Sequence, residues 1–138
     1  MEAVVVDGHQ IAFIQAGQGL PVILLGGFVG DAVATWHSQI EALSDTNAVL
    51  AWDAPGSGGS SDVPESFRLP DYADCLAGLV SRLELERLVV VGLSFGGALA
   101  LERVPAGGAV VAVADVAQDL DVDLGLDETR HLRDQRAV

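Results

Sequence analysis

The fold is decided by one stretch, Arg87-Leu88-Val89-Val90-Val91-Gly92-Leu93-Ser94-Phe95-Gly96-Gly97. Its first five residues predict a buried strand, and the residues after it, 98–102, are helix formers. A G-x-S-x-G pattern between a strand and a helix places its serine on a tight, strained turn at the carboxyl end of a sheet. There the Ser94 hydroxyl meets the positive end of the helix and the backbone N–H of Phe95, which can stabilise an oxyanion. The stretch predicts a serine nucleophile; the alternative is that Ser94 only caps the helix.

Short apolar segments on either side of this stretch predict further strands. Residues 4–6 and 9–13 flank the turn pair Asp7-Gly8, which predicts an opening β-hairpin. Continuous apolar runs are typical of parallel strands that helices cover on both faces. Such runs lie at residues 21–25, 47–52 and 109–114.

Two segments between these strands have helical spacing. The first ends at Ser44 and has Asp31 as its start signal, and the second presents one apolar stripe over residues 70–83. Trp36 and Cys75 lie in these segments, and we expect both in the core, with pocket lining left open for Trp36. The predicted class is α/β, a mostly parallel sheet with helices on both faces and an N-terminal antiparallel hairpin.

The periodicity fades toward the end of the chain. We assign residues 1–115 to the domain and residues 116–138 to an irregular acidic tail, in which only residues 127–135 have a weak helical pattern.

Charge and residue usage exclude several functions. Twenty acidic and seven basic residues give a formal net charge of −13, which repels phosphate backbones and anionic lipids, so we expect neither nucleic acid nor a membrane as partner. Every basic residue is arginine, which excludes lysine-dependent sites such as a P-loop or a Schiff base. A single cysteine and the lack of a basic leader favour a cytoplasmic protein.

Four segments follow the order of a known family. They are Val22 to Gly30, Trp36 to Ser44, Val49 to Ser61 and Val89 to Glu102. In this order they resemble the α/β-hydrolase superfamily, whose serine enzymes act through an acyl-enzyme. The resemblance implies that Ser94 is the acylated nucleophile and that Phe95 and Phe28 supply the two oxyanion N–H groups. It implies no cofactor and no metal.

The resemblance also bears on two turns. The loop from Asp53 to Ser61 looks like a structural turn of the family, so we expect Asp53 to accept hydrogen bonds within that turn rather than to act as a catalytic carboxylate. Where the family usually reads Leu-Leu-His-Gly, this chain reads Leu24-Leu25-Gly26-Gly27. Glycine has more conformational freedom than histidine, so we expect a looser oxyanion turn.

A nucleophilic serine needs an acid and a histidine base, which follow the serine in this family. Asp115, at the end of the strand after the nucleophile helix, is a candidate acid, with a turn residue as the alternative. His131 has the right order for the base but falls in the irregular tail. His9 and His37 precede Ser94 and are predicted to be surface residues.

Complete members of the family are longer, so we expect this chain to be the amino-terminal part of such a hydrolase, departing from the family pattern from Arg103 onward. A frameshift or a premature stop would produce this picture. An incomplete core that ends at its sixth strand would leave residues 109–114 as an unpaired edge suited to a homodimer.

Two interpretations of function stay open. The chain is a serine hydrolase that acts on a small-molecule ester, lactone, amide or similar carbonyl, or it is a noncatalytic module that binds a small ligand or a partner.

Overall fold

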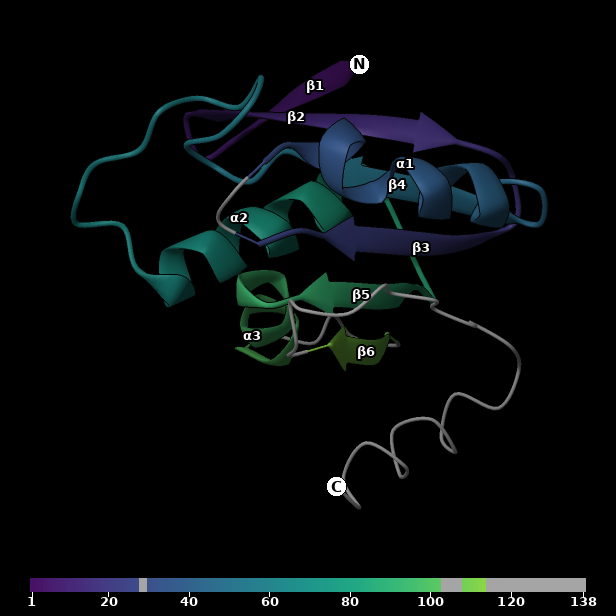
Figure 1. The fold of residues 1–138 in the computed structure, drawn as a ribbon. Coiled ribbons are helices and arrows are strands. Elements are labelled where there is room, and N and C mark those ends of the chain that lie inside the picture. Colours follow the sequence, from purple (N-terminus) through teal and green to yellow (C-terminus); the bar gives the residue numbers. More distant parts are fainter. Residues whose placement is uncertain (28–29, 103–107, 114–138) are drawn as a thin grey trace.

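The computed structural model describes residues 1–27, 30–102 and 108–113 (Figure 1). Six strands in this part of the chain form one sheet in the order β1-β2-β4-β3-β5-β6. The strands are β1 (Glu2–Val6), β2 (His9–Ala16), β3 (Leu20–Leu25), β4 (Asn47–Trp52), β5 (Val89–Leu93) and β6 (Ala109–Val113). The helices are α1 (Ala32–Leu43), α2 (Leu69–Arg82) and α3 (Phe95–Glu102).

The sheet is mixed in the way that the sequence predicts. β3 pairs in parallel with β4 and with β5, and β5 pairs in parallel with β6. β1 and β2 pair antiparallel, and β2 also pairs antiparallel with β4. The predicted α/β class with an antiparallel hairpin at one edge is therefore confirmed.

The opening hairpin has a tight turn at the predicted residues. Val6 pairs with His9, and Asp7 and Gly8 between them have φ angles of +48° and +82°. A two-residue turn with positive φ at both positions matches the right-handed twist of the strands it joins.

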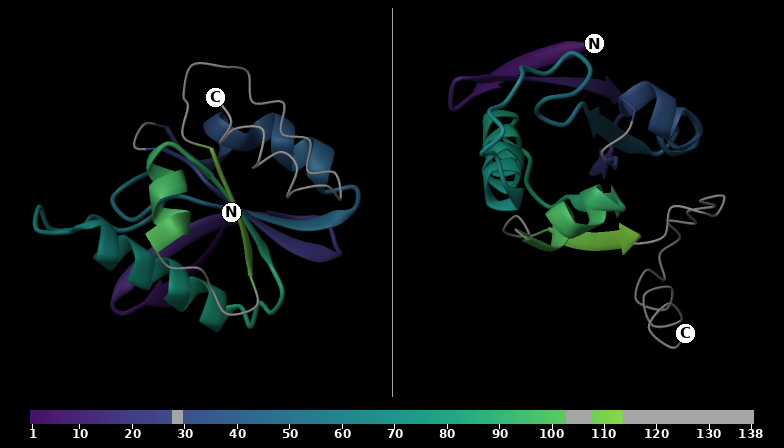
Figure 2. Two further views of the ribbon diagram at one scale, coloured as in Figure 1. Left: turned by 90° about the horizontal axis from the view of Figure 1, so that it is seen from below. Right: turned by 60° about the vertical axis from the view of Figure 1, so that its left-hand side comes forward.

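Helices cover both faces of the sheet, as Figure 2 shows. α1 packs on one face through Trp36, which contributes to a core cluster with Val22, Leu24 and other strand residues. α2 and α3 pack on the opposite face, where Leu76 and Leu99 belong to a larger cluster. The strands between the two layers are buried on both sides, which explains their continuous apolar runs.

The predicted start of α1 is confirmed. Asp31 precedes the helix in an extended conformation, and its carboxylate Oδ1 accepts the Ala34 N–H at 2.8 Å. Ser44 follows the last turn, so the predicted end is confirmed too. None of the helices in the described part of the chain is long and apolar enough to cross a membrane.

β5 starts two residues later than the sequence predicts. Arg87 has a φ angle of +46°, a left-handed conformation that cannot belong to an extended ladder. The strand therefore runs from Val89 to Leu93 and includes Gly92, which the sequence assigns to the turn.

Some predictions fall on residues outside the described ranges. These are the domain boundary at residue 115, the weak helix at 127–135, and the positions of Phe28, Asp115 and His131. β6 stands last in the strand order of the described sheet, and a homodimer through it stays a prediction.

Candidate active site

Ser94 lies on a sharp turn between β5 and α3. Its φ angle is +55°, which is uncommon for a residue with a side chain and is maintained only where the surrounding structure enforces it. The Ser94 carbonyl accepts the N–H groups of Gly97 at 2.9 Å and Ala98 at 3.2 Å, so α3 starts directly at the serine. The strained turn predicted from the G-x-S-x-G pattern is present, and its serine is only half-buried.

Close packing explains the two glycines of the pattern. A Cβ on Gly92 would collide with the backbone of Gly96, and a Cβ on Gly96 would collide with the carbonyl of Leu25. α3 therefore rests directly on the end of β3, and only glycine permits this approach. This contact holds the start of α3 in place and with it the serine turn.

The turn that follows β3 lies beside Ser94. A Cβ on Gly27 would stand 3.7 Å from the Ser94 Cβ and 3.8 Å from the Leu93 carbonyl oxygen. Phe95 is the first residue of α3, at the end of the helix where N–H groups and the positive dipole favour negative charge. The structure thus brings Gly27, Ser94 and Phe95 together, while Phe28 lies outside the described residues.

A cavity of about 470 Å³ opens next to this turn. Its lining includes two residues next to Ser94, residues of the 54–63 loop and one residue of α2. These residues are Gly27, Ala54, Pro55, Gly56, Ser57, Asp62, Val63, Tyr72 and Phe95. A volume of this size is typical of small-molecule sites.

Tyr72 is one of the cavity residues that the sequence does not single out. Its ring packs edge to face on Phe95, with 5.1 Å between ring centroids and 82° between ring planes. In the sequence Tyr72 is one member of the apolar stripe of α2. Its position at the beginning of the stripe could have indicated a place at the edge of the core. Tyrosine combines an apolar ring with a polar hydroxyl and favours positions where a core meets solvent.

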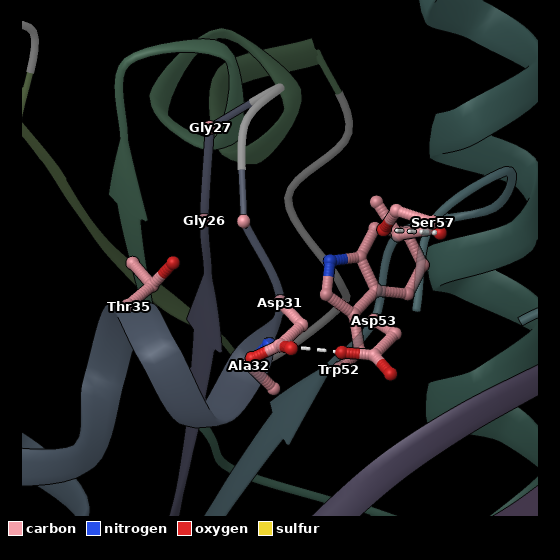
Figure 3. A pocket seen from close by; sticks show the side chains of 10 residues that line it. Gly26, Gly27, Asp31, Ala32, Thr35, Trp52, Asp53 and Ser57 are labelled. Atoms are coloured by element: carbon pink, nitrogen blue, oxygen red, sulfur yellow. Dashed lines mark hydrogen bonds between the residues drawn. The ribbon is translucent and has the colours of Figure 1, made fainter. Parts of the chain in front are cut away.

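Asp53 has the structural role that the sequence predicts. It is 1 % exposed, and its carboxylate accepts the Ala32 N–H at 2.8 Å and the Gly59 N–H at 2.9 Å. Figure 3 shows the first of these bonds, beside a small cavity of about 10 Å³. Asp53 ties the start of α1 to the 53–61 loop.

The described region contains two histidines, His9 at the start of β2 and His37 on α1. His9 is half-buried, with its ring centroid 5.4 Å from that of Phe67, so it is less of a surface residue than predicted because the 62–68 loop covers it. His37 is exposed on α1, as predicted. Neither lines the cavity beside Ser94.

Two core predictions are confirmed. Trp36 is 1 % exposed and Cys75 is 3 % exposed. Burial raises the pKa of the Cys75 thiol to about 11, and the nearby carboxylates of Asp7, Asp74 and Asp71 add to the rise. The thiol therefore stays protonated and packs as a small apolar group.

A largely parallel sheet with helices on both faces and a strained serine between a strand and a helix defines a class of α/β proteins in which a G-x-S-x-G turn joins the strand to the helix. The sequence model for the alpha/beta hydrolase fold matches residues 21–103. The chain belongs to this family.

Individual relatives support the same assignment. The chain is 36 % identical over 80 residues to a poly(3-hydroxyalkanoate) depolymerase of Ectopseudomonas oleovorans, covering 58 % of the chain and 28 % of that protein. It is 30 % identical over 95 residues to a soluble epoxide hydrolase of Corynebacterium sp. strain C12, covering 69 % of the chain and 33 % of that protein. The chain thus spans a third or less of the length of these curated relatives.

Solved structures have the same fold. A thermophilic esterase from Thermogutta terrifontis superposes with a TM-score of 0.67 at 36 % identity, covering 72 % of the chain and 39 % of the esterase. The described part of the chain is therefore an incomplete version of the core found in that enzyme.

Proposed function

We propose that this chain carries the nucleophile of a serine hydrolase that attacks an ester, lactone, amide or similar carbonyl through an acyl-enzyme on Ser94. The observation that carries the proposal is the left-handed turn at Ser94, with φ +55°, at the border of a 470 Å³ cavity lined by Gly27 and Phe95. Such a turn costs free energy. Ser94 itself is not among the lining residues, but its neighbours Gly27 and Phe95 are, so a substrate in the cavity would lie close to the serine.

In the proposed first step, the Ser94 Oγ forms a bond to the carbonyl carbon and its proton passes to a base. The carbonyl oxygen becomes an oxyanion, for which the N–H of Phe95 and, by resemblance, that of Phe28 are the donors. Collapse of this intermediate breaks the bond to the leaving group, which takes the proton. Water then cleaves the Ser94 ester and releases the acid.

The acid and the base of this mechanism remain proposals from the order of residues in the family. Asp115 and His131 are the candidates that follow Ser94. Loss of the histidine base from a serine triad lowers turnover by roughly 10⁶, so the activity of the chain depends on whether this group is in place.

The substrate does not transfer from the relatives. Their names include a depolymerase, an epoxide hydrolase and an esterase, and an epoxide is a different bond from an ester. Membership of one family therefore supports hydrolysis as the reaction class and leaves the substrate to be determined from the cavity of this chain.

A noncatalytic ligand-binding module is the second candidate. The observation that favours it is the position of His9 and His37, neither of which lines the cavity beside Ser94. With no base beside it, the Ser94 hydroxyl would retain an ordinary pKa and react slowly.

A fluorophosphonate probe distinguishes the two candidates. The hydrolase proposal requires covalent labelling of the wild-type chain, mapped to Ser94 by mass spectrometry and lost in Ser94→Ala. Ser57→Ala is the matched control, because Ser57 lines the same cavity but its hydroxyl donates to the Ala54 carbonyl at 3.0 Å. A folded wild-type chain that takes up no label supports the noncatalytic module.

A further inference from the structure

The cavity beside Ser94 has an uneven distribution of charge. Of its lining residues, Asp62 carries a carboxylate, Tyr72 and Phe95 are aromatic, and the others are small and uncharged. The lining as described contains no arginine or histidine. Among the described lining residues, the side-chain charge is therefore negative.

The arginine closest in sequence to this loop is already engaged. Arg68 directs its Nη1 to the carbonyls of Glu65, at 2.7 Å, and Phe67, at 3.0 Å. Its guanidinium is thereby turned toward its own loop. The net charge of −13 over the whole chain has the same sign as the carboxylate in the cavity and adds to its effect on an approaching ion.

The aromatic side of the cavity is well ordered by ring contacts. Tyr72 packs edge to face on Phe95 and also on Phe67, where the centroids are 4.9 Å apart and the planes 84° apart. Aromatic rings attract cations through their electron-rich faces, and organic ammonium groups are the ligands that combine best with rings and a carboxylate.

We propose that this cavity favours ligands with an organic ammonium group over carboxylate-bearing ligands of the same shape, with Asp62 as the charge-selecting residue. Tyr72 supplies the aromatic part of the attraction. The inference rests on the proposed function where it calls these ligands substrates, since it then predicts cationic esters or amides over anionic ones. As a statement about binding it stands on the cavity alone.

The expected size of the effect follows from exposure. Asp62 is an exposed residue, so water screens its attraction for a cation, and exposed pairs of this kind change affinity by up to about fivefold. The same screening applies to the repulsion of an anion.

Three phenols with different para substituents test the charge preference, and the cationic and the neutral one have the same shape. They are (4-hydroxyphenyl)trimethylammonium, 4-tert-butylphenol and 4-hydroxybenzoate, which are cationic, neutral and anionic at pH 7.5. Their dissociation constants are measured by calorimetry or ligand-observed NMR on the whole chain. We expect the cation to bind most tightly and the anion most weakly.

Asp62→Asn and a matched control assign the preference to one residue. In Asp62→Asn the affinity for the cation falls by up to about fivefold, that for the anion rises, and that for 4-tert-butylphenol stays the same. Glu65→Gln removes an exposed acid of the same loop that does not line the cavity and leaves the ratios unchanged. Equal shifts in both variants, no shift in Asp62→Asn, or no binding of any phenol overturns the proposal.

Tyr72 is tested with two variants. Tyr72→Phe keeps the ring and the preference, whereas Tyr72→Leu weakens binding of the cation more than that of the neutral phenol. Equal weakening of all three phenols in a folded Tyr72→Leu variant overturns the aromatic part of the inference.

These measurements need no hydrolysis, so the two proposals fail separately. If the chain prefers the cation through Asp62 but the fluorophosphonate does not label it, the binding inference stands and the proposed hydrolase is contradicted. If Ser94 is labelled but binding does not depend on charge, the proposed hydrolase stands and the binding inference is contradicted.

Discussion

The indole Nε1 of Trp36 lies 3.6 Å from the point at which a Cβ on Gly26 would stand. This nitrogen is buried and, among the described residues, has no hydrogen-bond partner. A buried donor without an acceptor costs about 1–3 kcal/mol. Gly26 follows Leu24-Leu25, at the position where the family usually has histidine. The side chain that glycine lacks would therefore lie next to the unpaired indole N–H of Trp36.

Gly26→Ser is predicted to stabilise the chain. The same Cβ would stand 3.5 Å from the Thr35 side chain, which is ordinary contact, and a serine hydroxyl attached to it can accept the Trp36 N–H. We expect Gly26→Ser to exceed Gly26→Ala in free energy of unfolding by about 1 kcal/mol, measured by urea denaturation. The alanine variant controls for the loss of glycine's freedom in the unfolded chain, so an equal or larger gain in Gly26→Ala contradicts the prediction.

Asp53 is predicted to affect stability and not reactivity. Asp53→Ala leaves the buried N–H of Ala32 without its acceptor, which costs about 1–3 kcal/mol. The N–H of Gly59 also loses its acceptor, but Gly59 is exposed and water can replace the carboxylate. We therefore expect a loss of about 1–3 kcal/mol in urea denaturation, against a change within about 0.5 kcal/mol for the exposed Asp62→Asn.

The prediction that Asp53 does not affect reactivity is tested with Asp53→Asn, which retains one acceptor oxygen. If the wild-type chain reacts with the fluorophosphonate, this variant, compared at a temperature where it is folded, should react at a similar rate. A rate reduced a hundredfold or more in a fully folded variant is evidence for a catalytic carboxylate instead.

Most helices and strands could be predicted from the sequence because the residue patterns that indicate them are local. Asp7-Gly8 has one favoured turn geometry, Asp31 has a side chain that caps a helix, and the apolar runs match strands buried on both faces. The start of β5 was misplaced because the positive φ of Arg87 reflects how the chain leaves α2 and has no signature in residue type.

The site was predictable only in part for a related reason. Gly92, Ser94 and Gly96 form a continuous motif, so the strained turn could be located from the sequence. The contact between Tyr72 and Phe95 joins α2 to α3, and such contacts depend on how helices far apart in the chain pack on one face of the sheet. Asp62 lies at the cavity because of the path of a long loop, and a loop has no hydrophobic periodicity from which its path could be predicted.

Gly96→Ala is predicted to disturb the serine turn. The added Cβ would collide with the Leu25 carbonyl, which is backbone and cannot turn aside, so α3 has to shift from the end of β3. We expect a loss of about 1–3 kcal/mol together with slower fluorophosphonate labelling. Gly27→Ala is the control for stability alone, since its Cβ would make only ordinary contacts, 3.7 Å from the Ser94 Cβ, but would lie in the cavity lining. Equal stability of the two variants would show that β3 and α3 are not in close contact.

Cys75 is predicted to be unreactive in the folded chain. Because burial, with the nearby carboxylates, raises the pKa of its thiol to about 11, almost no thiolate is present at pH 8, and the thiolate is the species that attacks a disulfide reagent. Ellman's reagent should therefore react with Cys75 only after the chain is unfolded in urea. Rapid reaction at pH 8 in the absence of urea contradicts both the burial and the raised pKa.

The same pKa predicts how stability depends on pH. Between pH 9 and pH 11 the unfolded chain loses the thiol proton while the folded chain retains it, so the unfolded state binds fewer protons and the free energy of unfolding falls as pH rises. A pKa raised from 9.0 to about 11 corresponds to a loss of roughly 2–3 kcal/mol across this range. Urea denaturation of the wild type and Cys75→Ala at pH 8, 9.5 and 11 isolates this contribution, because the other titrating groups are common to both. The wild type should lose more stability than the variant, and parallel decreases would mean that the folded and unfolded thiols have the same pKa.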